Sequence, residues 1–526
     1  MAVDQAGENV VFVIHDGMVE AHIQIQYEGD AERFAWVIPV PTEPTLSIGS
    51  EGLFIELQNS TVPTFELESV RVSCGGMSSS GGGCGMAAED GDTLAAFSSG
   101  VEVQSDGEVT LQQESVGAFE YSIVGGEDPN EVLDWLDNNG FLAGESGRPV
   151  LAEYAGRGHK FVALELRPGA QVQEIHPIVL RYPGDEACIP IKLTRIAATD
   201  DMGIRAFFLS NSRVVPNNFR HVTLNPVRFD WNALGQNYNN VVSVAVDSEG
   251  ADAHGFVTEY AGPSSVVDRG RIAQPMWYAD TFADIRPETL TDELTAQGLL
   301  DCQFGSCAPA SSVVAGLLEK YLPPPTELEP ALFYSCSSCY AHWIEEGSWQ
   351  VTAFTEAIET RYFTPAREAA ELLREWPYLT RMFTTISPAE MTKDPMFSEW
   401  ELYLPEVSNQ WSAAMSTGCG ETRLELDDGR RVNNPIPFVP FGADMPWTEK
   451  IESFSVWGEH RVLLSNTGII DAELARHNGD SSGTSITPSS RQSCAVNSSA
   501  PAPLRGAALL VLTLLGCARR ARRTRG

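Results

Sequence analysis

The chain has 526 residues, and its 71 Asp and Glu against 35 Lys and Arg give a net charge of −36 at pH 7. Such an acidic surface repels polyanions, which excludes electrostatic binding of nucleic acid. A chain of this length has room for more than one domain and for a large hydrophobic core.

The N-terminal half alternates apolar and polar residues in short runs, which indicates β-strands. Residues 10–14 and 19–27 flank a hairpin signal at residues 15–17 (His-Asp-Gly), and residues 34–40 form another strand-like run. Further runs of this kind follow at residues 119–124, 161–166, 172–182, 204–209 and 222–229. One helix is expected at residues 130–138, where apolar side chains recur with helical spacing.

The centre of the chain changes to helical spacing. Helices are expected at residues 292–299, 312–321 and 366–376, and a proline in its first turn opens the last one. Strands return at residues 423–426 and 454–464. The sequence therefore predicts an α+β fold with a β-rich N-terminal body of sandwich-like antiparallel sheets, a helical central part and a C-terminal membrane anchor.

The same pattern divides the chain into six segments. They are a β-rich domain at 1–280, a helical cysteine-containing region at 281–425, a short β return at 426–475, a Ser/Gly/Pro stalk at 476–504, a hydrophobic anchor at 505–518 and an Arg-rich cytoplasmic end at 519–526.

The C-terminal segment is typical of a membrane-retention or surface-sorting signal. Its apolar run at residues 506–518 spans 13 residues, whereas a transmembrane helix needs about 20, so Arg505 must reach the interface. The arginines that follow stay cytoplasmic by the positive-inside tendency: Arg519, Arg520, Arg522, Arg523 and Arg525. We therefore expect a membrane-anchored protein of the cell envelope with an extracytoplasmic body. A tail-anchored cytosolic protein and a frayed amphipathic end are the alternatives.

The N-terminal segment lacks the matching export signal. Residues 1–8 (MAVDQAGE) contain neither a basic n-region nor an apolar h-region. Because an exported body needs such a signal, we interpret the start as truncated and expect the natural protein to begin upstream of Met1.

The ten cysteines favour an oxidising compartment. Cys74 and Cys84 bracket nine residues that are almost all Gly and Ser, and we predict a disulfide between them because such a loop closes easily. Four more cysteines are disulfide candidates whose connectivity the sequence leaves open: Cys302, Cys307, Cys336 and Cys339.

Alternative interpretations apply to these cysteines and to one acidic pair. The four cysteines from Cys302 to Cys339 have a loosely zinc-like spacing, and Cys336-Ser-Ser-Cys339 alone has the form of a redox pair. Asp200 and Asp201 offer carboxylates to calcium, although a polar turn is the ordinary interpretation. No residue is assigned a catalytic or cofactor-binding role.

Several separate blocks resemble the DUF2330 family. They are residues 21–27 (AHIQIQY), 34–41 (FAWVIPVP), 180–190 (LRYPGDEACIP) and 382–391 (MFTTISPAEM), and the resemblance covers roughly residues 3–425. The resemblance implies exported proteins of unknown function, typical of myxobacteria and related δ-proteobacteria, that begin with a signal peptide. The tail resembles a myxobacterial sorting signal in which Cys494 matches the signal cysteine. No catalytic residue follows from this resemblance.

These observations predict a cell-envelope or surface protein with a binding or structural role. Its expected partners are the membrane and an envelope polysaccharide or protein, and its 11 tryptophans include rings suited to stacking on sugars. The alternative is a metal- or thiol-dependent extracytoplasmic enzyme that uses the cysteines from Cys302 to Cys339.

Overall fold

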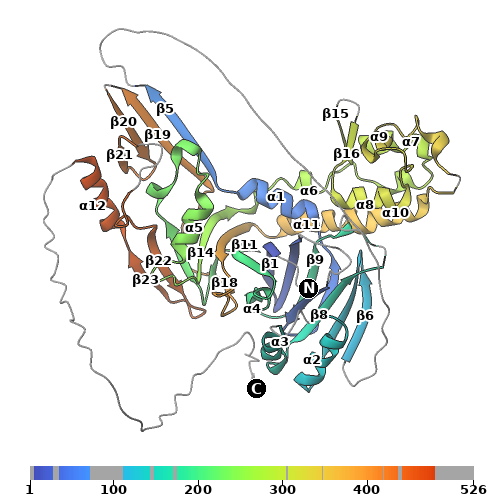
Figure 1. The fold of residues 1–526 in the computed structure, drawn as a ribbon, viewed down its shortest axis with the longest axis horizontal. Helices are drawn as coiled ribbons and strands as arrows, with labels where there is room; N and C mark the ends of the chain where they lie inside the picture. The colour runs from blue at the N-terminus through green and yellow to red at the C-terminus, as the bar shows by residue number, and fades with distance from the viewer. Residues whose placement is uncertain are drawn as a thin grey trace.

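The computed structural model describes residues 5–27, 35–71, 110–141, 147–168, 170, 174–303, 306–345, 347–418, 420–435 and 441–479. These residues form an α+β fold in which a large sheet lies among helices and smaller sheets (Figure 1). Within these ranges no helix is both long and apolar enough to cross a membrane. The predicted anchor and stalk, Cys494 and the predicted Cys74–Cys84 bridge lie outside the described residues.

Ten strands form the central sheet, and they come from distant parts of the chain. Their order is β23 (His460–Ser465), β22 (Thr448–Phe454), β13 (Arg220–Leu224), β14 (Gly255–Pro263), β17 (Tyr378–Ile386), β11 (Ala198–Ser210), β1 (Gln5–His15), β2 (Met18–Tyr27), β9 (Ile178–Pro183) and β4 (Thr45–Ile48). The β1–β11 and β13–β14 pairs are parallel, so the expectation of antiparallel sheets is correct only for the other pairs of this sheet. Long connections allow a strand to return in either direction. The sheet joins strands from three predicted segments, and the domain boundaries stay a prediction.

The first hairpin shows how the sequence sets the layers. Asp16 and Gly17 have φ of 49° and 73°, the left-handed conformation that a two-residue turn requires, and β1 folds back onto β2 as predicted. Side chains alternate along β1: Val11 faces one core and Phe12 faces the other. The middle of the central sheet is therefore buried on both faces.

A second sheet covers one of these faces. It is antiparallel, in the order β3 (Ala35–Val40), β8 (Lys160–Leu166), β7 (Phe119–Gly125) and β6 (Thr110–Val116). On its outer face lie α2 (Pro129–Asn138) and α3 (Gly147–Gly156), where Trp135 and Leu136 of α2 pack with Phe161. The predicted helix at 130–138 is α2, and Asp128 caps it.

Helices cover the opposite face of the central sheet. They are α1 (Glu51–Thr61), α6 (Arg269–Ile272) and α11 (Thr364–Glu375), extended outward by α7 (Pro287–Ala296), α8 (Ser312–Tyr321), α9 (Pro330–Ser335), α10 (Val351–Ile358) and the hairpin of β15 (Leu300–Gln303) and β16 (Ser306–Pro309) (Figure 1). A π-helical turn, Glu359–Phe363, leads from α10 directly into α11, which begins at Thr364 and has Pro365 in its first turn, as predicted. The wider turn accommodates a residue that lacks an N–H.

A third core lies toward the other end of the central sheet. There α5 (Tyr238–Val246) and α12 (Thr467–Asn478) pack with a four-stranded sheet. Its strands are β21 (Arg431–Asn433), β20 (Glu421–Leu426), β19 (Gln410–Gly418) and β5 (Thr64–Arg71), with β5 parallel to β19. The remaining small sheet consists of β10 (Ala187–Cys188), β18 (Met396–Glu399) and β12 (Val214–Pro216), next to α4 (Ile191–Thr194).

Most predicted strands agree with the structure, and the differences have local causes. The run at 172–182 is a strand only from the start of β9. The run at 222–229 ends with β13, because Pro226 has no N–H with which to continue a sheet. The run at 454–464 is the turn between β22 and β23 together with its flanks, where the chain reverses.

Candidate functional site

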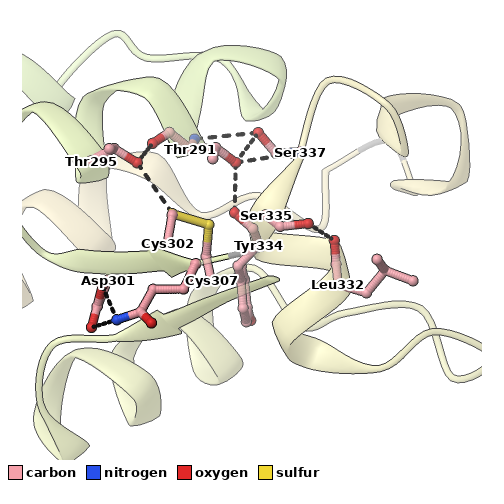
Figure 2. The surroundings of a disulfide bond; sticks show 10 residues. Thr291, Thr295, Asp301, Cys302, Cys307, Leu332, Tyr334, Ser335 and Ser337 are labelled. Atoms are coloured by element: carbon pink, nitrogen blue, oxygen red, sulfur yellow. Dashed lines mark hydrogen bonds between the residues drawn. A yellow bond between two sulfur atoms is a disulfide. The ribbon is translucent and has the colours of Figure 1, made fainter. Parts of the chain in front are cut away.

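The helical layer holds the four cysteines that the sequence singles out. Cys302 in β15 and Cys307 in β16 lie directly opposite each other, and their sulfurs are bonded at 1.97 Å (Figure 2). Cys302 is exposed, whereas Cys307 is buried in the helical core. The bond therefore closes the hairpin at the boundary between core and solvent.

The second cysteine pair lies at the end of a short helix. Cys336 directly follows α9, and its sulfur is bonded to that of Cys339 at 1.99 Å. The C-terminal end of a helix carries partial negative charge, which disfavours a thiolate. Reactive cysteines have low pKa values because they lie at helix N-termini or beside cations. These surroundings favour a structural disulfide over a redox pair.

Two threonines of α7 connect the surroundings of both disulfides. Thr295 Oγ1 lies 3.8 Å from Cys302 Sγ, and one turn earlier Thr291 Oγ1 lies 3.0 Å from Ser337 Oγ (Figure 2). The N–H of Ser337, which stands inside the C-x-x-C turn, also donates to Thr291 Oγ1 at 3.0 Å. The i, i+4 spacing of the threonines places them on one helix face. The surroundings of both disulfides therefore contact the same helix, α7.

The metal-binding alternatives remain predictions of the sequence. Among the described residues, no three His, Cys, Asp or Glu side chains are grouped as metal ligands. Zinc binding by the four cysteines requires both disulfides to be reduced first. Asp201 Oδ1 accepts a hydrogen bond from Ser243 Oγ, and its N–H donates to Ser387 Oγ, both at 3.1 Å. Asp201 lies within β11, where its φ of 52° marks an irregular point of the strand. Calcium binding there is a prediction without further support.

A buried polar network joins β22 to the strands beside it. The hairpin of β22 and β23 lies far from β15, β16 and α9, which hold or adjoin the cysteines (Figure 1). At its centre, His221 Nδ1 lies 3.3 Å from Glu452 Oε2. His221 Nε2 lies 3.0 Å from Thr258 Oγ1 and 3.2 Å from Arg213 Nη2. All four side chains are buried, and the neighbouring strands β13, β14 and β22 bring three of them together.

The hydrogen-bond partners determine the protonation of this network. A guanidinium has only donors, so Nε2 of His221 turns its lone pair toward Arg213, and Nδ1–H donates to Glu452. Burial lowers the pKa of His221 and keeps the imidazole neutral. Burial alone raises the pKa of Glu452, but hydrogen bonds from His221, Lys450 and His460 outweigh it and lower that pKa to about 2. Glu452 is therefore a carboxylate at neutral pH.

The sequence of contacts from Thr258 through His221 to Glu452 follows the order of nucleophile, base and orienting carboxylate in a catalytic triad. Thr258 is, however, only 7% exposed, and its Oγ1 accepts a hydrogen bond from Arg213 Nη2 at 3.1 Å. A substrate carbonyl has no approach to an oxygen in this position. The arrangement instead joins three strands of the central sheet, and no spacing in the sequence indicates it.

Arg213 also holds a neighbouring loop, residues 400–405. The N–H of Trp400 donates to Arg213 O at 2.9 Å, and Arg213 Nη1 donates to Pro405 O at 3.0 Å. Trp400 packs edge-on against Phe454 with ring centroids 5.1 Å apart, and Phe454 stacks on His460 at 4.7 Å. Arg213 and the rings of Trp400, Phe454 and His460 thus join the loop to the hairpin. Because these contacts hold both segments in place, the surface that the loop and the hairpin form together is a rigid candidate binding site.

The fold and its site define an α+β protein with a disulfide-closed helical layer and a rigidly supported hairpin. The chain belongs to the DUF2330 family, described as an uncharacterized protein conserved in bacteria, whose model matches residues 2–397. The family resemblance is therefore confirmed, whereas the myxobacterial origin and the sorting signal stay predictions. The match ends in β18, before Glu452. No curated protein and no solved structure matches the chain.

Proposed function

We propose that the protein is a binding protein of the bacterial cell envelope, with its body on the extracytoplasmic side. The observation that carries this proposal is the pair of disulfides in the helical layer. Disulfides persist in exported proteins, whereas the cytosol keeps thiols reduced. The arginine-rich tail supports the same location, because arginines remain on the cytoplasmic side of a membrane.

The use of the buried network supports binding over catalysis. The charges and hydrogen bonds of Arg213, His221 and Glu452 hold one loop and one hairpin in place. A binding surface gains affinity when its supporting residues are ordered before the partner arrives. A rigid surface on an exported body suits a receptor for an envelope component.

Protease treatment of the native host tests the location. We expect the body of the full chain to be cleaved in intact cells, or, if it faces the periplasm, as soon as the outer membrane is made permeable. A cytosolic marker protein must stay intact in both samples. A body that resists cleavage until the inner membrane is broken contradicts the proposal.

Sedimentation with isolated envelopes tests the binding. The full chain in mild detergent is expected to sediment with delipidated envelope material from the native host and to stay in the supernatant without it. Delipidation removes any contribution from insertion of the hydrophobic tail into lipid. A chain that stays in the supernatant at every envelope concentration contradicts the binding role.

A further inference from the structure

Large apolar side chains project from loop 400–405 and from the turn between β22 and β23. Leu402 and Tyr403 of the loop are 63% and 89% exposed, and Val456 and Trp457 of the turn are 49% and 74% exposed. We call these four residues the aromatic surface. Scattered exposed apolar residues are ordinary, but a gathering of this kind marks an interaction site.

The two parts of the aromatic surface are neighbours, because the residues that flank them are buried together. Trp400 and Leu404 stand on either side of the exposed pair in the loop, and both pack with Phe454 in one small core. Phe454 ends β22 and directly precedes the turn that carries Trp457. Tyr403 and Trp457 therefore project from adjoining segments.

The aromatic surface is held in one shape before any partner binds. The turn is closed by hydrogen bonds from Ser455 N–H to Glu459 O at 3.0 Å and from Glu459 N–H to Ser455 Oγ at 3.1 Å. The loop is closed by the two bonds of Arg213 to Trp400 and Pro405. Rings presented on ordered backbone contribute contact area at a low entropy cost.

Acidic side chains surround the aromatic surface. Glu401 on the loop and Glu406 directly after it are exposed, and Glu459 is exposed beside the turn, where it pairs with Arg461. The whole chain carries a charge of −36, so an anionic partner is repelled. The cores of protein–protein interfaces are depleted in Glu and Asp, so rings interspersed with carboxylates fit a protein partner poorly.

A sugar ring matches both features of this surface. The C–H face of a pyranose is flat and apolar enough to stack on Trp or Tyr, and its hydroxyls donate hydrogen bonds to carboxylates. We propose that the aromatic surface binds a polysaccharide without acidic groups, with Tyr403 and Trp457 stacking on its sugars. This proposal rests on the envelope-binding function proposed above and names the class of its ligand.

Affinity electrophoresis tests the ligand class. The full chain in mild detergent is run through gels that contain laminarin, xylan, glycol chitin or polygalacturonate. We expect retardation in at least one of the first three and none in polygalacturonate. Affinity should fall about tenfold or more in Trp457→Ala and in Tyr403→Ala, because each change removes a stacking ring, and Trp457→Phe should retain most of it. No retardation by any of the three non-acidic glycans overturns the proposal.

Tyr278→Ala is the matched control for loss of an exposed ring. Tyr278 is 64% exposed but lies beside the helical layer, between α6 and α7, so this variant should bind like the unaltered chain. An equal loss of affinity in Tyr278→Ala overturns the assignment to the aromatic surface. Circular dichroism of each variant verifies that it is folded, which is expected because only exposed side chains change.

Envelope sedimentation separates this proposal from the function on which it rests. If the chain with both Trp457→Ala and Tyr403→Ala sediments as well as the unaltered chain, the aromatic surface is excluded while the binding function stands. Loss of binding after periodate oxidation of the envelopes, but not after their proteolysis, supports a glycan. The reverse pattern identifies a protein partner and overturns the proposal. If the unaltered chain does not sediment, both proposals are overturned.

Discussion

Arg213 Nη2 and His221 Nε2 lie 3.2 Å apart in the interior, with a guanidinium against the lone pair of a neutral imidazole. The contact is favourable only while His221 lacks a second proton, because an imidazolium there would face a like charge. Since Arg213 also bonds the loop at Pro405, the protonation of His221 is coupled to the support of the aromatic surface.

The charge of Glu452 should contribute measurably to stability. Glu452→Gln deprives Lys450 and His460 of their carboxylate and weakens the bond to His221. We expect the free energy of unfolding to fall by about 2 kcal/mol, the scale of hydrogen bonds to a charged group. Urea denaturation followed by tryptophan fluorescence measures this. The control Glu425→Gln breaks an exposed pair and should leave the midpoint unchanged. Equal midpoints for the two variants would contradict the prediction.

Acid should weaken the same network in two steps. The folded-state pKa of His221 is lowered by burial, so its contribution is fully present above its ordinary value of 6.5 and is lost as the pH falls below it. The folded-state pKa of Glu452 is about 2 against an ordinary 4.5, so its contribution is present above pH 4.5 and is lost between pH 4.5 and 2. In urea titrations, Glu452→Gln should therefore lose less stability than the unaltered chain over that lower interval. Identical slopes there would be inconsistent with this assignment.

Ionisation of Glu8 should destabilise the folded chain, whereas ionisation of Glu452 stabilises it. Burial raises the pKa of Glu8 to about 7, and a hydrogen bond from Thr194 offsets only part of this effect. A raised pKa stabilises the folded chain below the ordinary value of 4.5, and that contribution is lost as the pH rises through 7. Glu8→Gln, which cannot ionise, should gain roughly 3 kcal/mol relative to the unaltered chain between pH 4 and pH 8. A difference between the two chains that does not change with pH would refute the prediction.

The sequence predicts those features that depend on residues close together in the chain. The alternation that identifies β1, β2, β7 and β8 is local, and so is the closeness of Cys302 to Cys307. The parallel pairing of β1 with β11 is not local, nor is the meeting of His221 with Glu452, which are 231 residues apart. Such contacts depend on how whole layers pack, which no spacing along the chain records.

Gly117 should tolerate no side chain. It has a φ of 59°, and a Cβ there would lie 1.9 Å from Nε2 of His176, which itself accepts a hydrogen bond from the Ala118 N–H. Gly117→Ala should lower the free energy of unfolding by about 3 kcal/mol or more. Gly140 also has a positive φ, of 79°, but open space around it, so Gly140→Ala should cost only about 1 kcal/mol. Thermal unfolding of both variants measures these two losses of stability. Equal losses in Gly117→Ala and Gly140→Ala would contradict the close approach of His176 to Gly117.

The Cys302–Cys307 bond should stabilise the helical layer. Closing this short loop removes entropy from the unfolded chain that is worth about 2 kcal/mol. Replacing both cysteines, as Cys302→Ser with Cys307→Ser, should lower the free energy of unfolding by about 2 kcal/mol and so lower the unfolding midpoint. Adding reductant should then lower the midpoint of the unaltered chain more than that of the variant. If reductant shifts both chains equally, the bond makes no contribution.

The state of the cysteines in the living cell tests the extracytoplasmic assignment most directly. Cells of the native host are quenched in acid, their free thiols are alkylated, and peptides of the full chain are mapped without reduction. We expect peptides linked through Cys302–Cys307 and Cys336–Cys339, and through the predicted Cys74–Cys84 bridge. Alkylated thiols at Cys302, Cys307, Cys336 and Cys339 would contradict residence in an oxidising compartment, and with it the proposed envelope function.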